Sequence, residues 1–283
     1  MTNHQLVFDL HSHSYFSDGI LSPSDLVERA VEKGVNVLAL TDHDETQGLS
    51  EATQKAQQLS CKLVQGVEIS ASWEKGKTVH IVGLNIDPDN QTLQEGLKSI
   101  REERIRRAKK IADKLHKAGV TNAWSDITEK CGFEAVTRTH FARYLVEIGA
   151  AKDIKQAFKK WLSRKGRAYV NGHWCDVETA VKWITSSGGQ AIIAHPVRYS
   201  YSRKQLDKLI QGFKVVGGEG IEVVGSRYSE KEKAEMASLA RRFELKSSVG
   251  SDFHGPDNPY VELGRNLELP VGTTPIWENW KIL

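Results

Sequence analysis

The segment Asp9-Leu10-His11-Ser12-His13 contains the residues best suited to chemistry near the start of the chain. The residues around it have the β-rich composition of a strand, and side chains on a strand alternate between its two faces. Asp9, His11 and His13 are therefore expected to project to the same side. Two imidazoles so placed can bind one metal ion, and Asp9 could orient one of them through a hydrogen bond. The HxH pattern alone is a weak signal, because it also occurs by chance.

Further histidines and carboxylates occur at or just after other predicted strands. Parallel strands present their carboxyl ends at one edge of a sheet, so side chains placed there are expected to converge. A single histidine is more often an ordinary core or surface residue whose ring nitrogens form hydrogen bonds. Six of the ten histidines lie at strands or strand ends, however, whereas His4, His116 and His173 are expected to be ordinary surface residues. The candidate metal-binding and catalytic set is His11, His13, Asp18, His43, Glu68, His80, His195, Asp252 and His254.

The donor types in this set indicate a divalent metal centre. Imidazoles and carboxylates without thiolates suit zinc, manganese or iron, and carboxylates that can bridge favour more than one ion. Neighbouring divalent ions polarise phosphoryl oxygens and lower the pKa of a shared water, which supplies a nucleophile at neutral pH. Hydrolysis of phosphoesters is the reaction that this arrangement serves best. The donor set does not choose among the three metals.

Arginines in the middle of the chain are candidates for binding substrate phosphates. Arg104 and Arg107 are three residues apart in a predicted helix, so they share one helical face. The alternative interpretation of this charged run is a solvated face with ion pairs such as Glu102 to Arg106.

A second group of phosphate-binding candidates surrounds the predicted start of a helix at Thr137-Arg138-Thr139-His140. Thr139 is the expected cap, and helix starts favour anions. Guanidinium groups match the geometry of phosphate oxygens. The candidates are Arg138, His140, Arg143 and Arg198. Further candidates, for stacking a base, are Phe141, Tyr144, Tyr199 and Tyr201, although helix packing is the better interpretation of Phe141.

These residues require a scaffold, and the chain alternates between strand and helix patterns. That alternation is typical of βα units around a parallel sheet. We predict an α/β fold, a distorted seven-stranded βα barrel with an all-helical insertion. The predicted strands are Leu6–His11, Val35–Thr41, Leu63–Ile69, Val79–Ile86, Gln190–Ala194, Gly220–Val224 and Leu245–Gly250. The predicted helices between them are Pro23–Lys33, Thr46–Leu59, Val177–Ser187, Lys204–Phe213 and Glu230–Phe243.

The alternation stops between Asp87 and Arg167, where no strand pattern appears. Three helices are predicted instead, over Leu93–Gly119, Thr139–Ile148 and Ile154–Leu162. The turn-forming run Pro88-Asp89-Asn90 marks the entry to this region. We therefore predict a helical insertion domain over 88–166 and a barrel domain formed by 1–87 and 167–283.

The composition argues against several other classes of protein. A chain of 283 residues with 39% hydrophobic and 27% charged residues is ordinary globular material. Lys and Arg exceed Asp and Glu by only 39 to 36, too little to indicate nucleic-acid binding by itself. The three cysteines form no CxxC pair, which disfavours a disulfide framework or a zinc knuckle. Without a signal peptide or long apolar run, the expected location is the cytoplasm with no membrane contact, and no protein partner is indicated.

The candidate ligands lie in motifs that resemble those of the PHP (polymerase and histidinol phosphatase) family. The motifs HxH, TDHD, a lone glutamate, AHP and SDxH occur in the family's order. Nearly end to end, the chain is similar to the bacterial TrpH subgroup, for example in DLHSHSYFSDGILSP, ALTDHDETQG and VGSDFHGP. The resemblance implies three metal ions. It places the first among His11, His13, Glu68 and Asp252, the second among Glu68, His80 and His195, and the third among Asp18, His43 and His254.

The resemblance also implies an activity. Members of the subgroup act as 5′→3′ exoribonucleases (RNase AM) that trim ribosomal RNA 5′ ends, and as nucleoside 3′,5′-bisphosphate phosphatases. Manganese is the expected metal, RNA 5′ ends or small nucleotides are the expected substrates, and Arg104 and Arg107 are expected to bind phosphate. Asp18 disfavours histidinol phosphatase activity, since those enzymes often have histidine there. The alternatives are a small-molecule phosphatase with no RNA role and a non-catalytic barrel stabilised by metals.

Overall fold

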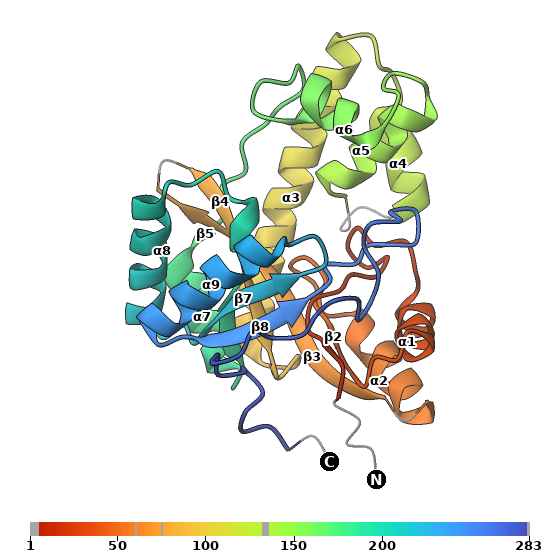
Figure 1. Cartoon of the computed structure of the whole chain (residues 1–283). Coiled ribbons are helices and arrows are strands. Elements are labelled where there is room, and N and C mark those ends of the chain that lie inside the picture. Colours follow the sequence, from red (N-terminus) through yellow and green to blue (C-terminus); the bar gives the residue numbers. More distant parts are fainter. Residues whose placement is uncertain (1–5, 60, 75, 132–135, 282–283) are drawn as a thin grey trace.

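A curved mixed sheet forms the centre of the molecule, for which a computed structural model describes residues 6–59, 61–74, 76–131 and 136–281 (Figure 1). Neighbouring strands follow the order β1-β2-β3-β4-β6-β7-β8, and β5 pairs with β3. The strands are β1 (Phe8–Asp9), β2 (Val37–Leu40), β3 (Lys62–Trp73), β4 (Lys77–Leu84), β5 (Cys175–Asp176), β6 (Gln190–Ile193), β7 (Gly220–Gly225) and β8 (Lys246–Gly250). Each of the predicted strands is present, and the short β5 was not predicted.

The sheet nearly closes into a barrel where the residues after β1 meet those at the end of β8. The N–H of Leu10 donates to the carbonyl of Val249 at 3.1 Å, and the N–H of Asp252 donates to the carbonyl of His11 at 2.9 Å. Closure brings the two ends of the chain's sheet together, so His11 and Asp252 become neighbours. The predicted distorted α/β barrel is confirmed.

The strand β4 runs antiparallel to both of its neighbours, β3 and β6. The expectation of a wholly parallel sheet is therefore wrong at this strand. A short turn joins β3 to β4, and a connection that short permits only an antiparallel hairpin. As a result, Glu68 lies within β3 rather than at its end, and His80 lies opposite Ser70 near the start of β4. The reversal brings His80 to the edge at which the parallel strands end.

Helices cover the outside of the barrel where the sequence pattern predicts them. They are α1 (Pro23–Glu32), α2 (Gly48–Gln58), α7 (Val177–Ser186), α8 (Arg203–Val215) and α9 (Glu230–Phe243). Ser22, Ser202 and Ser229 cap three of them by accepting a backbone N–H three residues later. No helix in the described part of the chain is long and apolar enough to cross a membrane.

The helical region begins with α3 (Gln91–Lys117), which rises from the barrel toward the other helices (Figure 1). It continues with α4 (Ala123–Cys131), α5 (Arg138–Glu147), α6 (Ile154–Ala157) and the π-helical turn η1 (Phe158–Leu162). The sequence did not predict α4. Part of α3 and the later helices bury a hydrophobic cluster of their own around Ile111, Leu115 and Phe141.

The first half of α3 belongs to the barrel core, because Leu93, Leu97 and Ile100 pack there. Gly96 permits this close approach: a Cβ at this position would lie 2.4 Å from the Trp183 ring on α7. Since α3 contributes to two hydrophobic clusters, the predicted domain boundaries at 88 and 166 stay a prediction.

Replacing Gly96 with valine is expected to lower the free energy of unfolding by about 1–3 kcal/mol, because the added methyl groups overpack the contact with Trp183. The measurement is equilibrium urea unfolding followed by circular dichroism. Gly212→Ala is the matched control, since a Cβ on this exposed glycine of α8 would meet no described atom within 4 Å. It should raise stability by about 0.5–1 kcal/mol. Equal effects of the two changes would contradict the proposed packing role of Gly96.

Candidate metal centre

His11 and His13 project to the same side of the chain after β1, while Ser12 faces away from them. The Ser12 hydroxyl donates to the carbonyl of Ala39 at 2.7 Å, which fixes the intervening residue against β2. The Nε2 atoms of His11 and His13 lie 3.1 Å apart, and both rings are fully buried. The predicted common orientation of the two imidazoles is therefore confirmed.

Glu68 lies at the centre of the histidines, and its two carboxylate oxygens face different groups of them. Oε1 is 2.8 Å from His80 Nδ1 and 2.8 Å from His195 Nε2. Oε2 is 2.8 Å from His43 Nδ1 and 3.4 Å from the Nε2 atoms of both His11 and His13. A carboxylate with this arrangement can bridge two cations.

The remaining candidates complete the cluster on either side of His13. Asp252 Oδ1 is 3.1 Å from His13 Nε2, and Asp18 Oδ1 is 3.1 Å from His254 Nε2. Three overlapping groups have ligand atoms that all lie within 4.8 Å of one another. They are His11, His13 and Asp252; His13, Asp18, His43 and His254; and His43, Glu68 and His80. The structure thus brings all nine predicted ligand residues together.

Several buried polar atoms in this cluster lack a partner, which tests whether a cation fits. Asp18 Oδ1, His43 Nδ1 and Glu68 Oε2 have no partner in hydrogen-bonding geometry among the described residues. Leaving such atoms unpaired in the interior is costly. Divalent cations would satisfy all three atoms, and imidazoles with carboxylates are suitable donors for them. The residues present therefore fit a centre with more than one metal ion.

The electrostatics favour the protonation states that metal ligands need. Burial by itself would raise the pKa of Asp18 and of Glu68, but neighbouring imidazoles outweigh it and hold both pKa values well below their usual range. Burial lowers the pKa of His13 to about 3 and that of His80 to about 4. At neutral pH the two carboxylates are ionised and the two imidazoles are neutral, so their lone pairs are available.

Glu222 on β7 was missed by the sequence analysis, although it orients two of the candidate ligands. Its Oε1 lies 2.5 Å from His11 Nδ1, and its Oε2 accepts the backbone N–H of His195 at 2.5 Å. The one available signal was a single glutamate within the otherwise apolar run Gly220–Gly225, which is buried throughout.

The role suggested for Asp9 is wrong, because its carboxylate does not contact an imidazole ring. It accepts the N–H groups of Ser251 at 2.8 Å and Gly264 at 3.0 Å instead. Asp9 thereby holds the loop after β8, which contains Asp252 and His254. Its contribution to the centre is indirect.

The backbone at His195, Asp252 and Asp44 is left-handed, with φ of 29°, 54° and 55°. Such values cost non-glycine residues energy and persist where the surroundings enforce them. Here hydrogen bonds to neighbours in the centre do so, for example from the Asp44 N–H to the Glu68 carbonyl at 3.0 Å. The strain fits a site whose side-chain directions are fixed by the fold.

The predicted phosphate-binding residues Arg104, Arg107 and Arg138 lie together beside the centre. They line a small cavity of about 80 Å³ that also borders His43 and His80. Arg104 is buried; its Nε donates to Asp44 Oδ2 at 2.6 Å and its Nη2 to Ser70 Oγ at 2.8 Å. Arg104 therefore also stabilises the protein itself through these hydrogen bonds.

Arg107 and Arg138 are less well paired than Arg104. The Nε of Arg107 donates to the carbonyl of Val170 at 3.0 Å. Arg138 has no hydrogen bond or ion pair with a described residue, and its guanidinium lies 5.9 Å from the centre of the Phe158 ring. Burial, together with the nearby charges of Arg138 and Arg104, lowers the pKa of Arg107 to about 9. The cavity thus has an excess of positive charge.

The start of α5 differs in detail from the prediction, because Thr137 and not Thr139 is the cap. The Thr137 hydroxyl accepts the N–H of Thr139 at 3.1 Å, and His140 Nδ1 accepts the N–H of Thr137 at 3.1 Å. Arg143 donates to the carbonyl of Asp18 at 2.9 Å. The Arg143 contact, together with the bond that the Thr137 hydroxyl donates to Asp18 Oδ2 at 3.2 Å, attaches the helical region to the loop that contains Asp18.

The structure places Arg198 at the centre, but it places the predicted base-stacking residues outside the two cavities. Arg198 forms an ion pair with Asp252 and helps, against the effect of burial, to hold the pKa of that carboxyl well below its usual range. None of the four aromatic residues predicted to stack a base lines either cavity at the centre. Phe141 and Tyr144 are buried in the helical cluster, Tyr199 accepts the N–H of His80 at 2.8 Å, and Tyr201 stacks on Tyr199.

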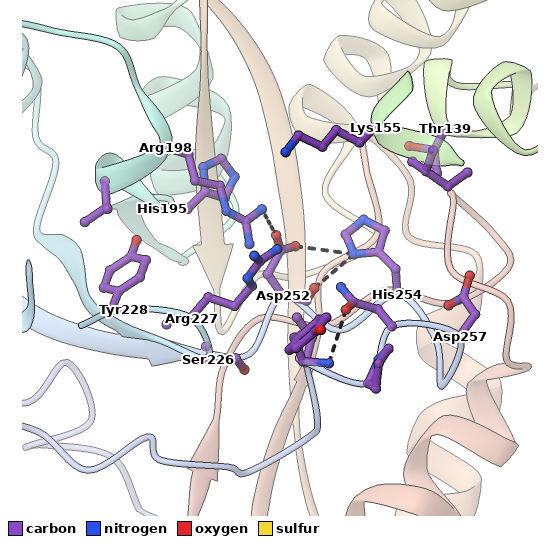
Figure 2. A pocket seen from close by; sticks show the side chains of 18 of the residues that line it. Thr139, Lys155, His195, Arg198, Ser226, Arg227, Tyr228, Asp252, His254 and Asp257 are labelled. Atoms are coloured by element: carbon purple, nitrogen blue, oxygen red, sulfur yellow. Dashed lines mark hydrogen bonds and ion pairs between the residues drawn. The ribbon is translucent and has the colours of Figure 1, made fainter. Parts of the chain in front are cut away.

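A second, larger cavity of about 940 Å³ opens beside other residues of the centre (Figure 2). His195, Asp252 and His254 line its inner end, together with Arg198. Lys155 reaches in from the helical region, while Arg198 and Arg227 reach in from the barrel. The candidate metal centre is therefore accessible from outside, as a catalytic site must be.

A barrel with clustered histidines and carboxylates at one edge defines a class of metal-dependent hydrolases, and comparison with known proteins agrees. The PHP domain model matches residues 9–170. This chain belongs to the PHP domain family. It is 45% identical to a "5'-3' exoribonuclease" of Haemophilus influenzae, over 96% of this chain and 98% of the relative. It is 43% identical to a "3',5'-nucleoside bisphosphate phosphatase" of Chromobacterium violaceum, over 95% and 94% of the two chains.

Two solved structures have a similar fold. An amidohydrolase from Chromobacterium violaceum with bound sulfate and no metal has a TM-score of 0.91 and 43% identity, over 95% of this chain and 94% of that one. A proposed metal-dependent phosphoesterase from Bifidobacterium adolescentis has a TM-score of 0.80 and 28% identity, over 96% and 93% of the two chains.

Replacing Glu222 with glutamine is expected to weaken metal binding roughly 10- to 100-fold, because partners that orient a ligand histidine contribute that much to affinity. Metal content after dialysis against graded chelator is the measurement, with circular dichroism to verify folding. Glu219→Gln is the control, since Glu219 precedes the same strand but pairs with Gln190 and Lys246 away from the centre. Unchanged metal retention in Glu222→Gln would exclude the orienting role.

Proposed function

We propose that the protein is a metal-dependent 5′→3′ exoribonuclease that releases mononucleotides from 5′-phosphorylated RNA. We propose that it also removes the 3′-phosphate of nucleoside 3′,5′-bisphosphates, and that maturation of ribosomal RNA 5′ ends is its physiological task. The observation that carries this proposal is the convergence of nine candidate ligands beside a cavity lined by three arginines. Relatives named for both activities, at 43% to 45% identity, support it.

Three divalent ions are assigned to the centre, with manganese as the metal. Glu68 would hold two of the ions, because one of its oxygens faces His80 and His195 and the other faces His11, His13 and His43. Asp252 joins His11, His13 and Glu68 as the ligands of the first ion. Asp18, His43 and His254 are the ligands of the third ion. When bound, such ions activate water and stabilise charge on phosphoryl oxygens.

The arginine cavity is assigned to a terminal phosphate of the substrate. Arg138 lacks a partner among the described residues, and the pKa of Arg107 is lowered by burial and by its two arginine neighbours. A phosphate would relieve this repulsion and accept charge-assisted hydrogen bonds from the guanidinium groups. In the solved Chromobacterium violaceum relative, a sulfate is bound, which resembles phosphate in charge and shape.

The position of this cavity accounts for the direction of cleavage. It borders His43 and His80, so a 5′-phosphate held there places the next phosphodiester at the candidate metal ligands. One mononucleotide would leave per turnover. A nucleoside bisphosphate bound in the same way presents its 3′-phosphate instead. Arg143 and Arg198 act here through Asp18 and Asp252, whose positions they fix.

A small-molecule phosphatase without an RNA role is the second candidate. The small volume of the arginine cavity, about 80 Å³, suits a single phosphate and is equally compatible with either substrate. A non-catalytic scaffold is disfavoured, because structural metal sites are closed and filled by protein ligands, whereas this centre borders an open cavity.

Turnover of three substrates by the manganese-loaded protein tests the proposal: short 5′-phosphorylated RNA, adenosine 3′,5′-bisphosphate and histidinol phosphate. We expect mononucleotide release from the RNA and phosphate release from the bisphosphate, with little activity on histidinol phosphate. His43→Ala should lower both activities by orders of magnitude while the circular dichroism spectrum is retained. Activity on the bisphosphate alone would favour the second candidate, and no activity on any substrate at full metal occupancy would favour the scaffold.

Replacing Arg138 with alanine is expected to raise KM for 5′-phosphorylated RNA roughly 10- to 100-fold, the cost of losing a charge-assisted hydrogen bond. KM for the same RNA with a 5′-hydroxyl should change little. Arg138 tests the assignment better than Arg104 or Arg143, which also support the protein internally. Arg164→Ala, an exposed arginine of the same region, is the control. An equal loss on both RNAs would count against a phosphate-binding role.

A further inference from the structure

The two cavities border different residues of the candidate metal centre and adjoin each other at Thr139 and Phe158, which line both. The small arginine cavity shares Asp18, His43 and His80 with the centre, whereas the large cavity shares His195, Asp252 and His254. A substrate that spans the centre therefore has one end in each cavity. If the 5′-phosphate occupies the small cavity, as proposed above, the rest of the substrate beyond the reacting phosphate lies in the large one.

The volume of the large cavity exceeds what inorganic phosphate requires. It measures about 940 Å³, near the upper end of the range of roughly 300–1,000 Å³ that is usual for small-molecule sites. Hydrolysis of a nucleoside bisphosphate at its 3′-phosphate would leave only inorganic phosphate on this side. The space instead suits further nucleotides.

The wall of the large cavity combines an exposed aromatic ring with unpaired cations. Tyr260 is 71% exposed, and the guanidinium of Arg227 lies 5.8 Å from the centre of its ring. The side chains of Arg227 and Lys155 form no hydrogen bond or ion pair with a described residue, and both point into the cavity (Figure 2). Large exposed aromatic rings beside cations are typical of surfaces that bind single-stranded nucleic acid, since bases stack on the rings and phosphates pair with the cations.

Two further features of the wall agree with a polar ligand. The hydroxyl of Ser226 is buried and lacks a hydrogen-bond partner among the described residues. Of the acidic residues farther from the centre, Asp153 is occupied as the cap of α6, where it accepts the N–H of Gln156 at 2.7 Å. Asp257 remains at the exposed rim.

We infer that Tyr260 and Arg227 form a platform for single-stranded RNA, which binds the nucleotides on the 3′ side of the phosphodiester that is cleaved. This inference rests on the proposed function and deepens it, because it names the feature that distinguishes RNA from a nucleoside bisphosphate. Tyr260 stacks on a base, and Arg227 and Lys155 pair with the following phosphates. RNA longer than a dinucleotide is therefore the substrate that this surface favours.

The test compares Tyr260→Ala and Arg227→Ala with the unmodified, manganese-loaded chain. Initial rates are measured on a 5′-phosphorylated hexanucleotide RNA and on adenosine 3′,5′-bisphosphate. Each change should raise KM for the RNA at least about fivefold, as the loss of a stacked base does, with kcat and the bisphosphate kinetics unchanged. Tyr260→Phe should restore the KM, because it keeps the ring. Arg241→Ala removes an exposed arginine outside the cavity and should have no effect.

Two outcomes would overturn the platform: an unchanged KM for RNA, or an equal loss on RNA and bisphosphate. If the unmodified chain degrades no RNA, the proposed exoribonuclease activity fails. The platform is then tested by competition, with the hexanucleotide as an inhibitor of bisphosphate hydrolysis. Inhibition that weakens in Tyr260→Ala would support the platform, and inhibition that is absent or unaffected by the change would refute it.

Discussion

The burial of three carboxylates among imidazoles is the constraint on which the rest of the structure depends. Asp18, Glu68 and Asp252 are almost completely buried, yet their surroundings keep the pKa of each well below its usual range. Isolated charges in the interior are costly unless they are paired. The imidazoles offset part of this cost, and bound cations would satisfy the atoms that remain unpaired.

The barrel serves this constraint by bringing distant parts of the chain to one edge. Closure between β1 and β8 makes His11 and Asp252 neighbours, and the antiparallel β4 delivers His80 from the start of a strand rather than its end. Hydrogen bonds then fix the directions of the side chains, with Glu222 orienting His11 and Asp9 holding the loop after β8. Rigid positioning of this kind is what catalysis by several cations requires.

In the function proposed here, the helical region makes the phosphoesterase centre selective. Arg104, Arg107 and Arg138 close one side of the centre, where space remains for a single phosphate. The other side stays open, between Lys155 of the helical region and Arg227 of the barrel. Because α3 packs in both hydrophobic clusters, the two sides keep a fixed relation to the centre. The proposed polarity of RNA cleavage follows from this asymmetry.

The sequence by itself determined the candidate ligands and the type of fold, because side-chain alternation and amphipathic spacing are local properties of the chain. His11 and His13 share a face whatever lies beside them. Tertiary structure alone decided which groups meet across the barrel: Glu222 beside His11, Thr137 beside Asp18, and Arg227 over Tyr260. The reversal of β4 was missed because the predicted strands ended at Ile69 and began again at Val79, which hid the short turn that makes β3 and β4 a hairpin. The contacts across the barrel depend on packing between segments that are distant in the sequence, so local sequence patterns cannot predict them.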